Sequence, residues 1–568
     1  MADETTDTVG IRAPEGDTEI IETDYRIGQD NITAKVGPFG LDIHNPVFLI
    51  SGLAVVMFVF YALALPDQAE SVFSWLFSSV TQGFDWFFLA AANIFVIFCL
   101  VLIVSPFGSV RLGGSEATPD YGYLGWFAML FAAGMGIGLL FFGVSEPMSH
   151  FSSSLGGTAM EGDVRTDWAP VGGAVGDEAA AQRLGMAATI FHWGLHPWAI
   201  YAVVALALAL FSYNKGLPLT LRSAFYPLLG DRVWGWTGHI IDTLAVFATL
   251  FGLATSLGFG AEQTASGLTF LFGSGDAADG TRAFLGITYG NSADSGVENN
   301  PLLLVLLISA ITAVALVSVV RGLDGGVKVL SEINMGLAAL LLLFVFFVGG
   351  PIFLITLFFD SIWAYFQNLF ALSNPFGRED VNFSQGWTSF YWAWWISWSP
   401  FVGMFIARVS RGRTVREFLI CVLIIPTTVC ILWMTVFGGT ALNQVVADGY
   451  TGALDAPLEL KLFQMLAELP LATITSVMGI VLVIVFFVTS SDSGSLVIDT
   501  ITAGGKVDAP VSQRVFWCIF EGAVAIVLLI GGGLASLQSA VISTGLPFTL
   551  VLLVMCYAIW KGLASEQR

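Results

Sequence analysis

Seven aromatic residues lie within twelve positions of one apolar stretch, residues 386–405. They are Trp387, Phe390, Tyr391, Trp392, Trp394, Trp395 and Trp398. The face of an aromatic ring attracts a cation, and tryptophan does so most strongly. A quaternary ammonium group has no N–H to donate, so hydrogen bonds cannot hold it and aromatic faces can. The cluster therefore indicates a site for a quaternary ammonium compound.

A second aromatic set belongs to an apolar stretch nearer the N-terminus: Trp193, Trp198 and Tyr201. The alternative for all these rings is a belt at the membrane–water interface, where tryptophan and tyrosine are enriched. The spacing argues partly against a belt. Trp395 and Trp398 share a helical face at i, i+3, and Trp394 and Trp398 share one at i, i+4. Because the rings at 390–395 cover several faces at once, some of them must point into the protein.

Two further motifs could bind a ligand or an ion. Gly134, Gly136 and Gly138 alternate in the third apolar stretch. They favour either close helix packing through small residues, the commoner case, or a broken helix that lines a cavity. The hydroxyl run 489–493 offers oxygen ligands for a hard cation, although such hydroxyls more often bond back to their own helix.

The elements that carry these residues are membrane spans. The chain has 568 residues, of which 56% are hydrophobic and 11% charged, against about 25% charged in soluble proteins. Since a span needs about 20 apolar residues, we count twelve. They are 46–66, 84–105, 121–146, 184–212, 236–260, 300–320, 330–358, 387–408, 417–440, 471–497, 514–534 and 540–560. The amphipathic stretches 360–374 and 457–468 are expected along the membrane surface.

The basic residues set the expected orientation. With the N-terminus inside, all but five of the 22 lysines and arginines fall on the inner side. The exceptions are Arg165, Arg183, Arg282, Arg378 and Lys461. By the positive-inside rule, both termini are expected in the cytoplasm.

Several classes of protein are disfavoured. No G-x-x-x-x-G-K-[ST] motif is present, which argues against an ATP-driven pump, and no basic patch suited to nucleic acid exists outside one short loop at 408–416. His192 and His196 are spaced for a metal, but only three other histidines are present. We therefore expect neither an enzyme nor a cofactor.

Five segments resemble the betaine/carnitine/choline transporter (BCCT) family. The longest, GWTSFYWAWWISWSPFVGMFIARVSRGRTVREF, is similar to the signature of that family. AAGMGIGLLFFGVSEP, FHWGLHPWAIYA, RGLDGGVKVLSEINM and FFVTSSDSGS also resemble it, in the expected order. The resemblance covers residues 45–560.

This resemblance implies an all-α polytopic membrane protein with twelve transmembrane helices and a LeuT-type fold. The expected parts are an acidic cytoplasmic tail (1–44), two peripheral helices (45–120), a first inverted repeat of five helices (121–358), a surface helix with a linker (359–386), a second inverted repeat (387–560) and a short cytoplasmic tail (561–568). Family members are typically homotrimers in the cell membrane, where lipids surround them.

The resemblance also assigns roles to individual residues. Substrate-binding positions are Trp193, Trp198, Tyr201 and Trp395, with Trp394 beside them, Met135 on an unwound segment, and Trp398 on the cytoplasmic path. Gating positions are Phe141 and Phe405. A sodium ion would be held by carbonyls of Ala132, Met135 and Phe486 and by hydroxyls of Thr489 and Ser490.

The expected function is sodium-coupled import of glycine betaine or a related small compatible solute, for osmotic adaptation. Gly138 favours a zwitterion, because choline-selective members tend to carry aspartate there. The fifth span lacks a basic residue and Val402 stands near a methionine position of sodium-independent members, which favours sodium as the coupling ion. Leu253 stands where a second sodium site would have a hydroxyl.

Other functions stay open. Proton-coupled choline uptake would use Asp242 or Asp492, both within spans. Sodium-independent exchange of carnitine or betaine is a second alternative. A sensor that binds without transporting, or a channel, belongs to a different class.

Overall fold

The computed structural model describes residues 13–37, 39–134, 136–157, 159–161, 164–275, 282–289, 300–321, 328–506 and 508–566. Within these ranges, eleven helices are long and apolar enough to cross a membrane. The chain is therefore a mostly helical, multi-pass membrane protein. The eleven are α1 (Val47–Ala64), α2 (Pro66–Val104), α5 and α6 counted as one (Glu178–Trp193 and Leu195–Ala209, followed by the π-turn η3, Leu210–Asn214), α8 (Trp236–Phe272), α9 (Leu302–Arg321), α10 (Lys328–Val348), α11 (Pro351–Leu372), α14 (Val415–Val446), α17 (Ala472–Thr502), α18 (Val511–Ile530) and α19 (Gly533–Ser565).

Two of the twelve predicted spans are absent from these eleven. The third is divided into α3 (Tyr123–Gly134) and α4 (Ile137–Gly156). The eighth, α13 (Ser389–Val409), is continuous, but it is rich in tryptophan and serine and is not among the helices apolar enough to be counted. Both predicted spans are helical in the structure. They are not counted because the third is interrupted and the eighth is less apolar.

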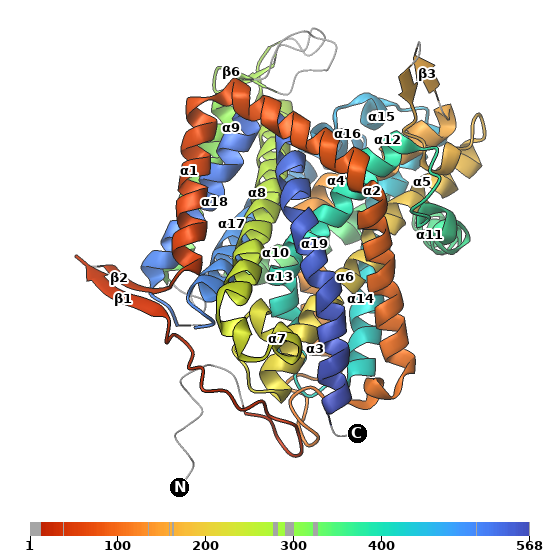
Figure 1. Ribbon diagram of the computed structural model, residues 1–568. Helices are drawn as coiled ribbons and strands as arrows, with labels where there is room; N and C mark the ends of the chain where they lie inside the picture. The colour runs from red at the N-terminus through yellow and green to blue at the C-terminus, as the bar shows by residue number, and fades with distance from the viewer. Residues whose placement is uncertain are drawn as a thin grey trace.

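Ten of the eleven helices correspond to predicted spans. The remaining one is α11, where we expected a segment along the membrane surface at 360–374. The predicted seventh span, 330–358, was too long, because α10 ends at Val348. Gly350 has φ +93°, a left-handed conformation that favours glycine, and Pro351 then begins α11. Figure 1 shows α11 nearly end-on, across the direction of the long helices.

The shorter elements gather at the two ends of the helix bundle (Figure 1). The hairpin strand β3, the strand β6 and the helices α15 and α16 lie at one end, whereas β1, β2 and the end of α19 lie towards the other. The short elements are β1 (Asn31–Val36), β2 (Phe39–His44), β3 (Ala159–Glu161), β4 (Val164–Thr166), β5 (Ala283–Phe284), β6 (Ile287–Thr288), α7 (Tyr226–Leu229), α12 (Val381–Phe383), α15 (Gly452–Asp455), α16 (Lys461–Ala467), and the single turns η1 (Pro106–Ser109), η2 (Pro170–Gly172), η4 (Leu221–Phe225), η5 (Gly230–Trp234), η7 (Ser384–Thr388) and η8 (Leu458–Leu460).

The segment before the first span, which we expected as an acidic tail, forms a β-hairpin and contacts the helix bundle. Strands β1 and β2 pair antiparallel, with Asn31 opposite His44. Further towards the N-terminus, Glu15 forms a 2.6 Å ion pair with Arg411. Tyr25 stacks on Trp234 at 4.2 Å between ring centroids. The described part of this acidic segment therefore packs against the end of the bundle that carries the arginine-rich loop.

The centre of the bundle is formed by α6 and α13. In an apolar 18-residue stretch of the span that contains α5 and α6, 94% of the residues are buried within the protein, against 22% in α10. A helix that is apolar on every side is suited to such a central position. Gly403 of α13 lets the two helices approach closely, because a Cβ atom there would lie 2.9 Å from Cβ of Val204 on α6. These two rigid helices carry most of the aromatic residues discussed below.

Candidate functional site

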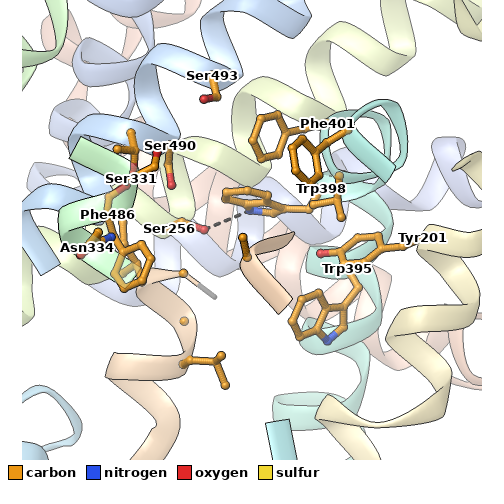
Figure 2. Close-up of a pocket in the computed structure, with 18 of the residues that line it drawn as sticks. Tyr201, Ser256, Ser331, Asn334, Trp395, Trp398, Phe401, Phe486, Ser490 and Ser493 are labelled. Carbon is orange, nitrogen blue, oxygen red and sulfur yellow. Dashed lines mark hydrogen bonds between the residues drawn. The ribbon is translucent and has the colours of Figure 1, made fainter. Parts of the chain in front are cut away.

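A cavity of about 290 Å³ lies between α3, α4, α5, α6, α8, α10, α13 and α17. One wall is aromatic and is made of Trp193, Tyr201, Trp394, Trp395, Trp398, Phe401 and Phe405. The opposite wall offers hydroxyl and amide groups: Ser331, Asn334, Thr489, Ser490 and Ser493. Figure 2 shows this division, with Tyr201 and Trp395 facing Ser331, Asn334 and Ser490 across the space.

The Trp395 ring stands nearly perpendicular to two other rings of the aromatic wall, Trp193 and Tyr201. The Trp395 ring lies 5.0 Å from that of Trp193 at 88°, and 5.5 Å from that of Tyr201 at 80°. Trp395 is fixed by its indole N–H, which donates to the carbonyl oxygen of His192 at 2.9 Å. Such a corner presents several π-faces to one small volume, which is the arrangement that holds a quaternary ammonium group.

Ser256 of α8 fixes two more rings and was not identified from the sequence. Its hydroxyl oxygen accepts the indole N–H of Trp394 at 3.2 Å and that of Trp398 at 3.0 Å. Figure 2 shows the bond from Trp398. A lone serine in an apolar helix carries no signal that separates this role from bonding to its own helix. Ser331 and Asn334 were also missed, although both lie in the quoted segment RGLDGGVKVLSEINM.

The predicted substrate residues are distributed as follows. Trp193, Tyr201, Trp394, Trp395 and Trp398 all line the cavity. Trp198 is buried outside the lining, packed edge-on against Tyr201 at 5.4 Å and 77°. Met135 lies outside the described residues. Of the two predicted gating residues, Phe405 lines this cavity and Phe141 lines another.

That second cavity, of about 500 Å³, follows the first along the helices. On α4 the lining changes from Gly138 and Leu139 to Phe141, and on α13 it changes from Trp394 back to Phe390. An aromatic layer separates the two spaces. Its rings are Phe142, Phe259, Phe390 and Trp394, and the centroids of contacting rings in this set lie 5.4–5.9 Å apart.

The break between α3 and α4 opens directly onto the first cavity. Gly136 is extended, with φ −167° and ψ −176°, and Gly136, Ile137 and Gly138 line the space. Of the two explanations given above for the glycines, the broken helix is therefore the one observed. Gly138 leaves no room for a side chain, because a Cβ atom would lie 2.7 Å from Cη2 of Trp394 and 3.0 Å from Cη2 of Trp193.

Of the residues predicted to bind sodium, those that the structure describes line the same cavity. Ala132, Phe486, Thr489 and Ser490 line it. The hydroxyl of Thr489 donates to the carbonyl oxygen of Val485 at 3.0 Å, so in this structure it bonds within its own helix. The described lining residues include no Asp, Glu, Lys, Arg or His, and so the site carries no fixed charge on its surface.

A buried polar network stands directly behind the aromatic wall and was also missed. One carboxylate oxygen of Glu146, Oε2, accepts the indole N–H of Trp193 and the hydroxyl of Tyr391, each at 2.6 Å. The other, Oε1, contacts Nδ1 of His192 at 2.6 Å and Nε2 of His150 at 3.1 Å. The only sequence signal was one carboxylate inside an apolar span.

Glu146, His150 and His192 bring their potential ligand atoms within 4.8 Å of one another. Ligands of a tetrahedral zinc ion lie about 2.0–2.2 Å from the metal and so roughly 3.3 Å from each other. The 2.6 Å separation of Glu146 and His192 is that of a hydrogen bond. The arrangement is therefore a hydrogen-bond network, in which each imidazole can donate an N–H to the carboxylate.

Comparisons with known proteins agree with this geometry. The model of the betaine/carnitine/choline family transporters matches residues 46–568. A glycine betaine/proline/choline transporter of Vibrio parahaemolyticus is 65% identical over 98% of this chain and 97% of its own length. Glycine betaine transporter 1 of the same organism is 54% identical over 97% and 98% of the two chains. A glycine betaine transporter of Acinetobacter baylyi is 41% identical over 92% of this chain and 74% of its own.

These relatives are transporters and not enzymes, which confirms the expectation from the missing catalytic groups. The match covers every element that lines the two cavities. The resemblance noted from the five sequence segments is confirmed, and the chain belongs to the betaine/carnitine/choline transporter family.

Proposed function

We propose that this protein is a secondary active transporter that imports glycine betaine, or a related quaternary ammonium compatible solute, together with sodium for osmotic adaptation. The observation that carries the proposal is the cavity with an aromatic corner on one wall and hydroxyl groups on the other. The names of the relatives, which include glycine betaine in each case quoted, support the choice of substrate.

The trimethylammonium head would occupy the corner formed by Trp193, Tyr201 and Trp395. Each π-face contributes about 0.5–2 kcal/mol to the binding of a cation. The carboxylate of a zwitterion would point to the start of α4, where Ile137 and Gly138 line the cavity. The first N–H groups of a helix lack partners within the helix and carry partial positive charge, so they attract an anion. Trp198 would support Tyr201 from behind.

Sodium would bind between the broken span and α17. Its proposed ligands are carbonyl oxygens of Ala132, Met135 and Phe486 and hydroxyl oxygens of Thr489 and Ser490, which suit a hard cation. The broken span would then carry ligands for both sodium and substrate. This sharing supports coupling, because sodium binding would stabilise the conformation that completes the substrate site.

Proton coupling and exchange are the main rivals. Asp242 is buried in a 3.2 Å ion pair with Arg222, and neither Asp242 nor Asp492 is among the lining residues. The absence of a carboxylate from the described lining supports sodium over a proton. For direction of transport, we propose that Trp398 and Phe405 border the cytoplasmic path, since α13 leads from them to the arginine-rich loop. Phe141 and the aromatic layer would close the opposite path.

The finer architecture is part of the same proposal. We assign twelve spans, with α3 and α4 forming one span and α11 lying along the membrane surface, in two inverted repeats of the LeuT type. Both termini would be cytoplasmic. Exposed aromatic side chains on α11 support a homotrimer: Phe359, Trp363, Phe366 and Phe370. Native mass spectrometry of the purified protein tests the trimer directly.

The test of function is uptake of radiolabelled glycine betaine into proteoliposomes, with and without an inward sodium gradient. We expect accumulation above equilibrium only with the gradient. Uptake that needs internal substrate and ignores sodium would establish an exchanger, and binding without accumulation would establish a sensor. Competition by choline tests the selectivity for a zwitterion that we assign to Gly138. Choline is the relevant competitor because the name of one Vibrio relative includes it. Strong competition would contradict the selectivity assigned to Gly138 and leave the aromatic corner unaffected.

A further inference from the structure

We propose that Glu146 is the buried counter-charge of the substrate site: its carboxylate fixes Trp193 and Tyr391 and increases the attraction of the Trp193 ring for a quaternary ammonium head. This inference rests on the proposed function and names a residue that acts through the aromatic wall. Glu146 does not line the cavity. It is therefore a positioning residue with an electrostatic contribution.

The hydrogen-bond partners of Glu146 suit an ionised carboxylate. Glu146 is fully buried and has four partners, two on each oxygen. An ionised carboxylate only accepts hydrogen bonds and has about four acceptor positions. The indole of Trp193 can only donate, and the hydroxyl of Tyr391 and the imidazoles of His150 and His192 can donate as well. The four donors therefore fill the acceptor positions of the anion.

The negative charge reaches the cavity through Trp193. Its N–H group lies 2.6 Å from the carboxylate oxygen, while the same side chain forms part of the cavity wall. Hydrogen bonds polarise one another in a medium of low dielectric constant. An indole that donates to an anion gains electron density in its ring, which strengthens the interaction of the ring face with a cation.

The surroundings increase this effect. The described lining contains no charged side chain that could oppose or screen the carboxylate. The Tyr391 ring stacks on His192 at 4.6 Å and 14°, and these two groups cover the carboxylate from the side. Electrostatic interactions are stronger in such a water-poor interior than in solvent. A glutamine would retain part of the hydrogen bonding and remove the charge, so the two contributions can be separated.

The test compares two ligands of nearly equal shape in purified protein at a fixed sodium concentration. Glycine betaine carries a trimethylammonium head, and 3,3-dimethylbutanoate carries an uncharged tert-butyl group in its place. Equilibrium dissociation constants are measured for the wild type and for Glu146→Gln, with Asp499→Asn as the control. Asp499 is a buried carboxylate, hydrogen-bonded by Gln513 at 3.1 Å, and lies outside the cavity.

We expect Glu146→Gln to weaken betaine binding about tenfold, the size of one good cation–π contact. Binding of 3,3-dimethylbutanoate should not weaken by more than about twofold, since its uncharged tert-butyl head does not respond to ring polarisation. Asp499→Asn should leave the ratio of the two constants unchanged. Equal weakening of both ligands would overturn the proposal and leave Glu146 a purely structural role.

A double-mutant cycle keeps the proposal testable if the glutamine disturbs packing. Trp193→Phe preserves an aromatic face and removes the N–H donor to Glu146. In that background, Glu146→Gln should no longer change the ratio of the two dissociation constants. An undiminished change of the ratio would show that the charge does not act through Trp193. If the wild type itself fails to bind betaine, the proposed function is wrong, a result distinct from either outcome for Glu146.

Discussion

Replacing Trp395 by leucine tests the aromatic corner most directly. The indole stands at 88° to Trp193 and at 80° to Tyr201, so it supplies one of three sides around the proposed position of the ammonium head. Leucine keeps an apolar side chain and removes the π-face. The expected effect follows from the loss of one face out of three.

One cation–π contact is worth about 0.5–2 kcal/mol, which corresponds to a two- to thirtyfold rise in the dissociation constant for glycine betaine. Because Trp193 and Tyr201 of the same corner are buried, we expect a value in the upper half of this range. The lost hydrogen bond to the carbonyl of His192 should cost about 1 kcal/mol of folding stability and not of affinity. Trp395→Phe retains a face and should lose less affinity than leucine.

The assay is equilibrium binding of glycine betaine to purified protein, with thermal unfolding measured on the same samples. Trp517→Leu serves as the control, because Trp517 of α18 is fully buried and packs on Phe48 and Phe516, away from the cavity. Its affinity for betaine should match that of the wild type. A folded Trp395→Leu protein with unchanged affinity would refute the assignment of the corner as the ammonium site.

Three other changes have defined outcomes. Gly138→Ala should weaken betaine binding, since the added Cβ atom would lie 2.7 Å from the Trp394 ring; unchanged affinity would show that the ring moves freely. Thr489→Ala should raise the sodium concentration needed for half-maximal uptake, and an unaltered sodium dependence would remove this hydroxyl from the proposed site. Burial and the nearby Arg222 guanidinium lower the pKa of His44 to about 3. The unfolded chain, with a histidine pKa of about 6.5, therefore binds the extra proton first. Stability should fall by about 1.4 kcal/mol per unit as the pH drops below 6.5, and His44→Gln should flatten this slope in thermal unfolding between pH 7.5 and pH 5.

The sequence was most informative where the chemistry is concentrated. The aromatic run of α13 indicated a cation site because so many rings could not all face the interface. Helical spacing shows which rings share a face but not which face lies inside. The structure makes this choice, turning Trp394, Trp395 and Trp398 to the cavity and Trp392 away from it.

The roles of single polar residues in fixing the aromatic wall could not be predicted from the sequence. Ser256 organises two indoles, and Glu146 anchors Trp193, yet each stands alone in an apolar helix. Their partners come from helices more than 40 residues away in the chain. Spacing within one helix carries no information about such pairs, so they required the packed bundle.

Helix boundaries were predictable only in part. The glycines at 134–138 permitted a break without requiring one, because small residues also serve helix packing. The end of α10 was misplaced by ten residues, since the apolar stretch continues through Gly350 and Pro351 into α11. Hydropathy alone does not register a turn within an apolar stretch, whereas a left-handed glycine followed by proline produces one.

Under the proposed function, Trp394 would link substrate binding to the closure of the second path. Its ring borders the first cavity, and the same ring packs on Phe142, Phe259 and Phe390 in the layer that separates the two cavities. Opening the second cavity to the first requires this ring to leave those contacts. Gly138 lines the first cavity beside this ring, and a Cβ atom there would lie 2.7 Å from Cη2 of Trp394, so a side chain would displace the ring. The residue at position 138 therefore affects the fit of the substrate and the stability of the closed layer together, so a selectivity change at this position should also change the transport rate.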